Sequence, residues 1–172
     1  MWLLPEWLDQ YEAAVRQSEM YFRILMSALV GFVIGWNREA KNKPGGIKTY
    51  MFVCVACALM TLISIYSVER YGNFNPNTSM DPMRVAAQIV SGLGFLGAGM
   101  ILKSGFRVIG LTSAAMVLFV GGAGIGIGAG FYGVVLFAVA VTMTMAAIGN
   151  AVERGRWKKR QTVEGVDSAS PA

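Results

Sequence analysis

The sequence predicts an all-α membrane protein: a polytopic bundle of five transmembrane helices, preceded by a short N-terminal amphipathic helix. Hydrophobic residues make up 55% of the 172 residues and charged residues 15%, whereas a soluble domain usually carries about 25% charged residues. Residues 108–152 contain no charged side chain. As one helix they would extend about 67 Å, roughly twice the hydrocarbon core of a bilayer, so the chain must fold back within them.

Residues 1–19 are predicted to form the amphipathic helix, which lies at the membrane surface. Trp2, Trp7 and Tyr11 recur at helix-like spacing, with leucines between them. Aromatic side chains favour the membrane–water interface. The segment carries four acidic residues and no basic start, so it does not read as a signal peptide.

The first span, residues 20–36, holds a pair of glycines that suits close helix packing. Gly31 and Gly35 lie one turn apart on the same face, and their missing side chains allow a neighbouring helix to approach. Arg23 is near the start of the span and can extend toward the surface. Glu19 precedes it by four residues, in the favourable order for a helical ion pair.

The second span, residues 49–68, is an uncharged run of 20 residues, near the length that crosses a core of about 30 Å. Cys54 and Cys57 lie within it as a CxxC pair. Because no acid or histidine is nearby, we interpret them as two small packing residues rather than a redox pair. Residues 69–79, rich in asparagine with a glycine and a proline, predict an ordered surface loop.

The third span, residues 82–102, begins with Asp81 as its N-cap and Pro82 as its first helical residue. Polar side chains then form one stripe at helical spacing: Asp81, Arg84, Gln88 and Ser91. Two interpretations stay open. The stripe is a helix cap with an i, i+3 ion pair at the membrane surface, or it is a polar vestibule or ion-sensing site that enters the bundle from outside.

The same span contains four glycines within eight residues: Gly92, Gly94, Gly97 and Gly99. Each glycine costs a helix about 1 kcal/mol relative to alanine in water. The run therefore predicts very close packing, or a break in the helix whose freed backbone groups are satisfied by neighbours. The letters GxGxxG also occur here, but a dinucleotide site needs a preceding strand and a later acid, and this sequence predicts neither.

The last two spans are predicted at residues 111–127 and 131–150, with the turn at the glycines of residues 128–133. The tail, residues 153–172, contains five Lys or Arg residues and ends in a polar stretch. This composition predicts a disordered cytoplasmic tail that contacts anionic lipid.

The placement of positive charge predicts the orientation. Eleven of the 15 Lys and Arg residues lie in residues 38–48, in residues 103–107 and in the tail, all on one side of the five spans. The positive-inside rule then puts the N-terminus outside and the C-terminus in the cytoplasm. The net charge of +5 belongs to this topology, so the expected partner is the lipid bilayer and not nucleic acid.

No arrangement of residues predicts catalysis. The chain has no histidine, which is the commonest metal ligand and the usual base near pH 7. We therefore expect no enzymatic activity, no cofactor and no metal site. On the cytoplasmic side four charged residues should lie near one level: Arg38, Glu39, Lys103 and Arg107. They either pair between helices or form a docking surface for another membrane complex.

Taken together, these residues resemble the N-terminal membrane domain of the MgtC/SapB family. The resemblance covers residues 21–149 and is carried by four strings: Gly31 and Gly35 with Arg38-Glu39, residues 46–49, residues 84–99 and residues 110–115. Asn37 stands where the family often has an acid, Lys48 where it commonly has Arg, and Ser113 where it commonly has Thr. Several members continue into an ACT-like cytoplasmic domain, which we do not expect in this chain.

The resemblance implies a bacterial inner-membrane protein that acts in adaptation to low magnesium and in virulence inside macrophages. It also implies a partner, the F-type ATP synthase, which the best-known member restrains. The expected function is therefore non-enzymatic regulation of a membrane complex. The alternative is a small ion transporter or channel that uses the polar stripe and the glycine-rich third span.

The residues that would carry these functions fall into two groups. The functional candidates are Arg38, Glu39, Asp81, Arg84, Gln88, Ser91, Lys103, Arg107 and Thr112. The candidates for helix packing are Gly31, Gly35, Gly92, Gly94, Gly97 and Gly99. A third hypothesis is a homo-oligomeric scaffold in which these glycines serve only assembly. A homodimer is then expected, because symmetric dimers are the commonest oligomers.

Overall fold

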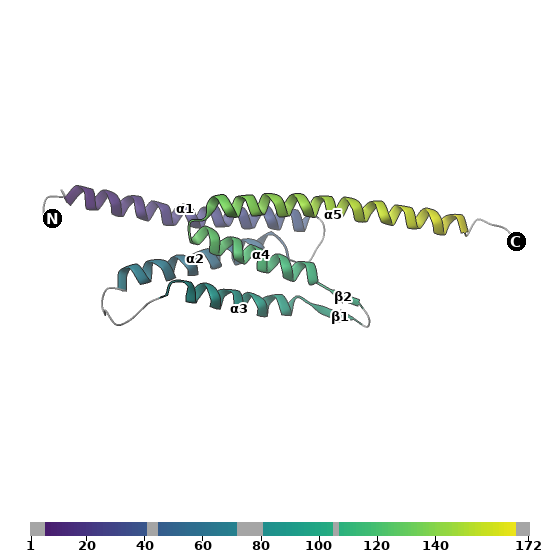
Figure 1. Cartoon of the computed structure of the whole chain (residues 1–172), viewed down its shortest axis with the longest axis horizontal. Coiled ribbons are helices and arrows are strands. Elements are labelled where there is room, and N and C mark those ends of the chain that lie inside the picture. Colours follow the sequence, from purple (N-terminus) through teal and green to yellow (C-terminus); the bar gives the residue numbers. More distant parts are fainter. Residues whose placement is uncertain (1–5, 41–44, 72–80, 105–106, 168–172) are drawn as a thin grey trace. The chain divides into compact units, whose positions relative to one another are not determined.

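The computed structural model describes residues 6–40, 45–71, 81–104 and 107–167 (Figure 1). Its elements, in chain order, are α1 (Glu6–Glu39), α2 (Ile47–Tyr71), α3 (Met83–Gly99), β1 (Leu102–Ser104), β2 (Arg107–Ile109), α4 (Leu111–Gly128) and α5 (Tyr132–Asp167). The chain divides into two compact units, Met1–Val135 and Leu136–Ala172. The first contains the packed helices α1 to α4, and the second contains most of α5.

The protein is a multi-pass α-helical membrane protein. Among the described residues, four stretches are long and apolar enough to cross a membrane: Ala14–Glu39, Ile47–Tyr71, Leu111–Gly128 and Tyr132–Val152. The predicted all-α class and membrane location agree with this finding. The helix α3, predicted as a fifth span, has 17 residues and is not among the four.

The first helix is continuous where the sequence predicted two segments. The predicted amphipathic helix, residues 1–19, and the predicted first span merge into α1, which runs unbroken from Glu6 to Glu39. No glycine or proline occurs between Glu6 and Gly31, so no residue in that stretch interrupts the helix. Residues 1–5 of the predicted amphipathic segment lie outside the described residues.

Helices α1 and α2 pack closely and antiparallel at the two glycines of α1. A methyl group added at Gly31 would lie 2.7 Å from the Cα of Met51, and one added at Gly35 would lie 2.6 Å from the Cα of Ile47. Both distances are far below van der Waals contact. The backbones can therefore approach this closely only because both residues lack a side chain.

Helices α2 and α4 run parallel and pack closely at glycines of α4. A methyl group at Gly124 would lie 2.3 Å from the carbonyl oxygen of Cys54, and one at Gly128 would lie 2.7 Å from the carbonyl oxygen of Ala58. Since the residue numbers of the contacting pairs rise together along both helices, the two helices point the same way. Cys54 and Cys57 are buried free thiols, as expected for packing residues.

Helix α3 returns antiparallel to α4, beside both α2 and α4 (Figure 1). Its Leu93 side chain fills the space at Gly121, and its Gly97 faces Ala114. The residue numbers on α3 rise as those on α4 fall, which defines the opposite direction. Thus α3 connects the end of α2 to the start of α4, which lie at opposite ends of the unit.

A short hairpin joins α3 to α4 where the sequence predicted only a basic loop. Strands β1 and β2 are antiparallel, with Lys103 opposite Val108. The hairpin ends at Gly110, whose φ of 94° lies in the left-handed region. A methyl group there would lie 2.0 Å from the carbonyl oxygen of Met100, so only glycine fits this corner.

In the second unit, residues 136–167 are helical. The sequence predicted a disordered tail at residues 153–172, but α5 continues as a helix to Asp167. Its basic stretch is rich in Arg, Lys, Glu and Gln, all good helix formers, which accounts for the difference. Between α4 and α5, the predicted turn contains Gly130, with a φ of 87°.

Candidate functional site

The start of α3 is capped by Asp81. Its carboxylate accepts the backbone N–H of Met83 at 2.8 Å. Pro82 already has helical angles, with φ −65° and ψ −20°, so Asp81 is the residue that stands just before the helix. This is the arrangement that the Asp-Pro sequence predicted, and it satisfies one of the free N–H groups at the helix start.

The polar stripe of α3 lies on the outer surface of the first unit. Arg84, Gln88 and Ser91 are all exposed. The buried residues of this helix lie on the other side: Ala86, Ile89, Leu93 and Gly97. Within the described part of the chain, the structure records no ion pair between Asp81 and Arg84. Within this unit the stripe therefore does not form the polar vestibule that was expected inside the bundle.

Three of the four glycines of α3 lie on open surface as well. A methyl group added at Gly92, Gly94 or Gly99 would meet nothing within 4 Å. Only Gly97 is near another helix, with Ala114 at 3.7 Å from the added methyl. The helix does not break at these residues. The sequence predicted close packing or a break, and at these three positions this chain shows neither.

A groove of about 530 Å³ runs between α2 and α3. Phe52 and Met60 line it from α2, and Val85, Gln88 and Gly92 line it from α3. The lining is apolar apart from the amide of Gln88 and the thiol of Cys57. One face of the predicted stripe therefore borders a cavity that is shaped for an apolar occupant and carries one hydrogen-bonding amide.

At the other end of the bundle, the Arg38 side chain is buried, with 7% of its surface exposed. Its Nη2 donates to Oγ of Ser113, at 2.5 Å, on the first turn of α4. Its Nε is buried without a hydrogen-bond partner. Glu39 instead accepts the backbone N–H of Ile47 at 3.0 Å and so caps the start of α2. Each member of this pair therefore contacts a different helix N-terminus.

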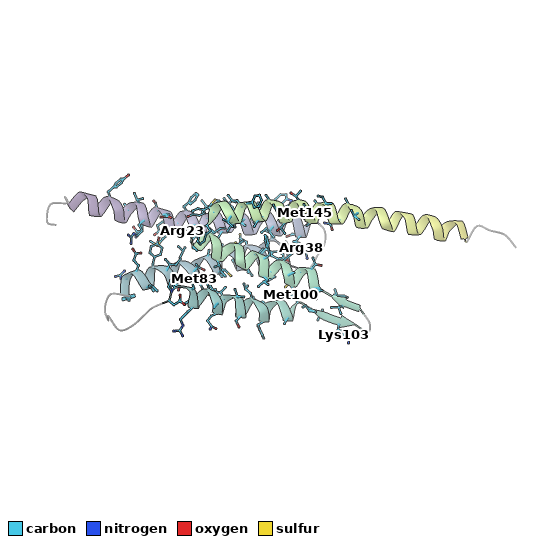
Figure 2. All side chains as sticks on the ribbon, viewed as in Figure 1. Arg23, Arg38, Met83, Met100, Lys103 and Met145 are labelled. Atoms are coloured by element: carbon cyan, nitrogen blue, oxygen red, sulfur yellow. The ribbon has the colours of Figure 1, made fainter. Side chains whose placement is uncertain are left out.

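Lys103 lies near this end as well, and among the described residues it forms no ion pair with Glu39. Lys103 is exposed on β1, and Figure 2 shows it at the same end of the unit as Arg38. Thr112 is exposed beside Ser113. Arg107 is on β2, and its side chain lies outside the described residues.

A second charged cluster joins α1 to the far ends of α2 and α4. Arg23 forms an ion pair with Glu19 and donates from Nη1 to the carbonyl oxygen of Gly128 at 2.7 Å. Arg16 forms an ion pair with Glu69 of α2. In Figure 2, Arg23 and Arg38 lie at opposite ends of the packed part of α1.

Local sequence patterns predict only part of these contacts. The spacing of four residues predicts the pairing of Arg23 with Glu19. It does not predict the contact of Arg23 with Gly128, which is 105 residues away, or the hydrogen bond from Arg38 to Ser113, 75 residues away. The local signal for the Arg23 contact is a cation inside a predicted membrane span, whereas Arg38 lies just after that span.

In the described part of the chain, no group of three or more His, Cys, Asp and Glu side chains could hold a metal ion. The described side chains are suited to binding. The outer surface of α3 presents polar groups and the exposed backbone of its glycines, and the end of the bundle that contains Arg38 presents hydrogen-bond donors. Both surfaces could recognise another molecule.

Comparison with known proteins matches a model of the MgtC family to residues 24–155. An uncharacterized protein of Haemophilus influenzae is 38% identical over 143 residues, 83% of this chain and 60% of that protein. Protein SapB of Bacillus subtilis is 42% identical over 115 residues, 66% of this chain and 49% of its own length. The Escherichia coli K12 protein YhiD, named a putative magnesium transporter, is 30% identical over 131 residues, 76% of this chain and 60% of its own.

The chain thus spans about half to three fifths of the length of these curated relatives. No solved structure matches it.

Proposed function

The chain belongs to the MgtC family, and from that premise we propose that it is a non-enzymatic regulator that binds another membrane protein complex through α3. One observation carries this proposal. The polar stripe and three glycines of α3 lie on the outside of the first unit, where none of that unit's described residues covers them. We call this surface the outer face of α3, formed by Arg84, Gln88, Ser91, Gly92, Gly94 and Gly99.

The outer face of α3 is suited to a helix and poorly suited to lipid. An amide or hydroxyl exposed to lipid tails has no hydrogen-bond partner there. Small residues allow a partner helix to approach to backbone contact, and Gln and Ser side chains can bond across such an interface. Both features of this face are therefore satisfied by a transmembrane helix of another protein.

This proposal includes α3 as a fifth membrane span. Since α2 and α4 run parallel, the chain must return across the same thickness between them, and α3 is the element that does so. Its 17 residues extend about 26 Å at 1.5 Å per residue, close to a core of about 30 Å. Five spans, together with the positive-inside rule, support an inner-membrane orientation with the N-terminus outside.

The proposed partner is the F-type ATP synthase, and the proposed setting is adaptation to low magnesium, as the family resemblance implies. The test is a photo-crosslinking residue placed at Gln88 in cells grown at low magnesium, with the same residue at Leu25 as control. Leu25 is an exposed apolar position of α1. We expect an adduct with a synthase subunit at Gln88 and none at Leu25. Equal labelling at both positions would contradict the proposal.

Ion transport is the second candidate, and a relative favours it, since the E. coli relative carries the name putative magnesium transporter. In this case the polar stripe would line a path formed against a second copy of the chain. Purified protein in liposomes should then carry a flux of Mg²⁺, K⁺ or protons that Asp81→Asn and Gln88→Ala reduce. A flux equal to that of empty liposomes rejects this candidate and leaves the regulator untouched.

A further inference from the structure

The N-termini of α2 and α4 contact side chains of opposite charge. Each helix start bears partial positive charge and unpaired N–H groups. At α2 the carboxylate of Glu39 accepts one of them, from Ile47. At α4 a cation, Arg38, contacts the first turn, where its guanidinium donates a hydrogen bond to Ser113. The first arrangement neutralises the helix start, and the second adds positive charge to it.

The start of α4 also lacks a side-chain cap. The residue before the helix is Gly110, which has no side chain to accept an N–H. The first backbone hydrogen bond of the helix runs from the N–H of Ala114 to the carbonyl of Gly110, at 2.9 Å. The N–H groups of Leu111, Thr112 and Ser113 precede that bond, so the helix itself provides them with no acceptor. These three donors belong to the same first turn as Ser113, whose hydroxyl contacts the buried Arg38 guanidinium.

Arg38 has no carboxylate partner in the described structure. The ion pairs among the described residues are Arg16–Glu69 and Arg23–Glu19, both at the other end of α1. Arg38 keeps only 7% of its surface exposed, and its Nε is buried without a partner. A buried cation normally needs a counter-charge. Its closeness to the C-terminal end of α1 supplies only part of one.

We propose that Arg38, Ser113 and the first turn of α4 form a binding site for a phosphate-class oxyanion. The Ser113 hydroxyl accepts from Arg38, so its own hydrogen is free to donate to a ligand. Thr112 is exposed beside it and adds a second hydroxyl. A phosphate group would supply what this end lacks: negative charge at a helix start and several acceptors for convergent donors.

The geometry favours phosphate over a simple halide. A guanidinium is a planar fork that matches two oxygens of one phosphate, and N–H groups at a helix start match a third. The source is either dissolved phosphate or the phosphodiester headgroup of an anionic lipid, since both present negatively charged phosphate oxygens. The site does not depend on the outer face of α3, so either proposal can fail alone.

Binding of radiolabelled inorganic phosphate to the delipidated full chain in dodecyl maltoside tests this site, because those micelles contain no phosphate. We expect saturable binding that Arg38→Gln weakens about tenfold or more, since hydrogen bonds to charged groups are lost. Arg38→Lys should fall between the two, because it keeps the charge and loses the fork. Arg70→Gln is the matched control: it removes one positive charge from the far end of α2 and should change binding less than about twofold.

A second variant covers the case in which Arg38→Gln does not fold. Ser113→Ala keeps the arginine and removes only the hydroxyl, and it should weaken phosphate binding about threefold or more. Phosphatidylglycerol added to the micelles then separates the two sources. It displaces the phosphate from the wild-type chain if a lipid headgroup is the ligand, and leaves the affinity unchanged if dissolved phosphate is.

Three results would overturn the proposal. The first is the absence of saturable phosphate binding by the delipidated wild-type chain. The second is wild-type affinity in folded Arg38→Gln and Ser113→Ala. The third is an equal loss in Arg70→Gln, because binding would then follow net charge and not this site.

Discussion

Helices α3 and α4 are both rich in glycine but use it in opposite ways. In α4, a methyl group at Gly121, Gly124, Gly126 or Gly128 would come within 3 Å of another residue. In α3, three of the four glycines would meet nothing within 4 Å. The same residue type therefore brings α4 against its neighbours and leaves α3 open. Glycine content alone does not say which surface a membrane helix packs with.

The polar side chains of the two helices follow the same division. Ser113 of α4 is 2% exposed and bonded to Arg38. Gln88 and Ser91 of α3 are exposed. A helix whose glycines and polar groups are both satisfied is a structural element of the bundle. A helix whose glycines and polar groups are both open is the candidate surface for a second protein.

The largest expected effect is on α4. Gly124→Ala places a methyl group 2.3 Å from the carbonyl oxygen of Cys54, and backbone atoms cannot move aside cheaply. We expect the free energy of unfolding in detergent to fall by about 3 kcal/mol. The matched control is Gly122→Ala in the same helix, where the methyl would meet nothing within 4 Å. An equal loss of stability in the two variants would show that close packing at Gly124 does not cause the destabilisation.

The second effect concerns binding by α3. Gly94→Leu puts a bulky side chain on the outer face, at a position where an added methyl group meets nothing within 4 Å. We expect unfolding in detergent to stay within about 1 kcal/mol of wild type and the crosslink from Gln88 to fall at least about tenfold. A variant that unfolds would show instead that this glycine packs within the chain.

The parts of the fold that the sequence predicts are those set by local pattern. The uncharged run of residues 49–68 lies within α2 (Ile47–Tyr71). The Asp-Pro pair predicts the start of α3, and the glycine run predicts the turn at Gly130. Each depends on residues within one or two turns of each other. An apolar run, a cap or a turn acts over that distance.

The parts that the sequence does not predict depend on which helices meet. A polar stripe on a membrane helix can face inward to a cavity or outward to a partner, and its spacing is the same in both cases. The stripe of α3 faces outward. Likewise, the contacts of Arg23 with Gly128 and of Arg38 with Ser113 join residues 105 and 75 positions apart. They follow from the antiparallel packing of α1 and α4, which no short motif encodes.

A smaller effect is expected from the amide on the outer face. Gln88→Leu keeps the size of the side chain and removes its hydrogen bonds, and Leu suits the apolar groove that Gln88 borders. Hydrogen bonds between membrane helices average about 0.6 kcal/mol, which corresponds to about threefold in affinity. Co-purification of the partner should fall by that factor with unfolding unchanged. An unchanged yield would mean that the amide faces lipid or water and not a partner.

The smallest change separates the two uses of glycine most directly. Gly94→Ala adds one methyl group, which by itself raises helix stability by about 0.5–1 kcal/mol. If the outer face of α3 only meets lipid, the variant should be more stable and bind its partner as before. If a helix packs there to backbone distance, the same methyl group should raise stability and lower the crosslink yield about threefold. Because the two readouts then move in opposite directions, the result distinguishes an open surface from an interface even though each shift is small.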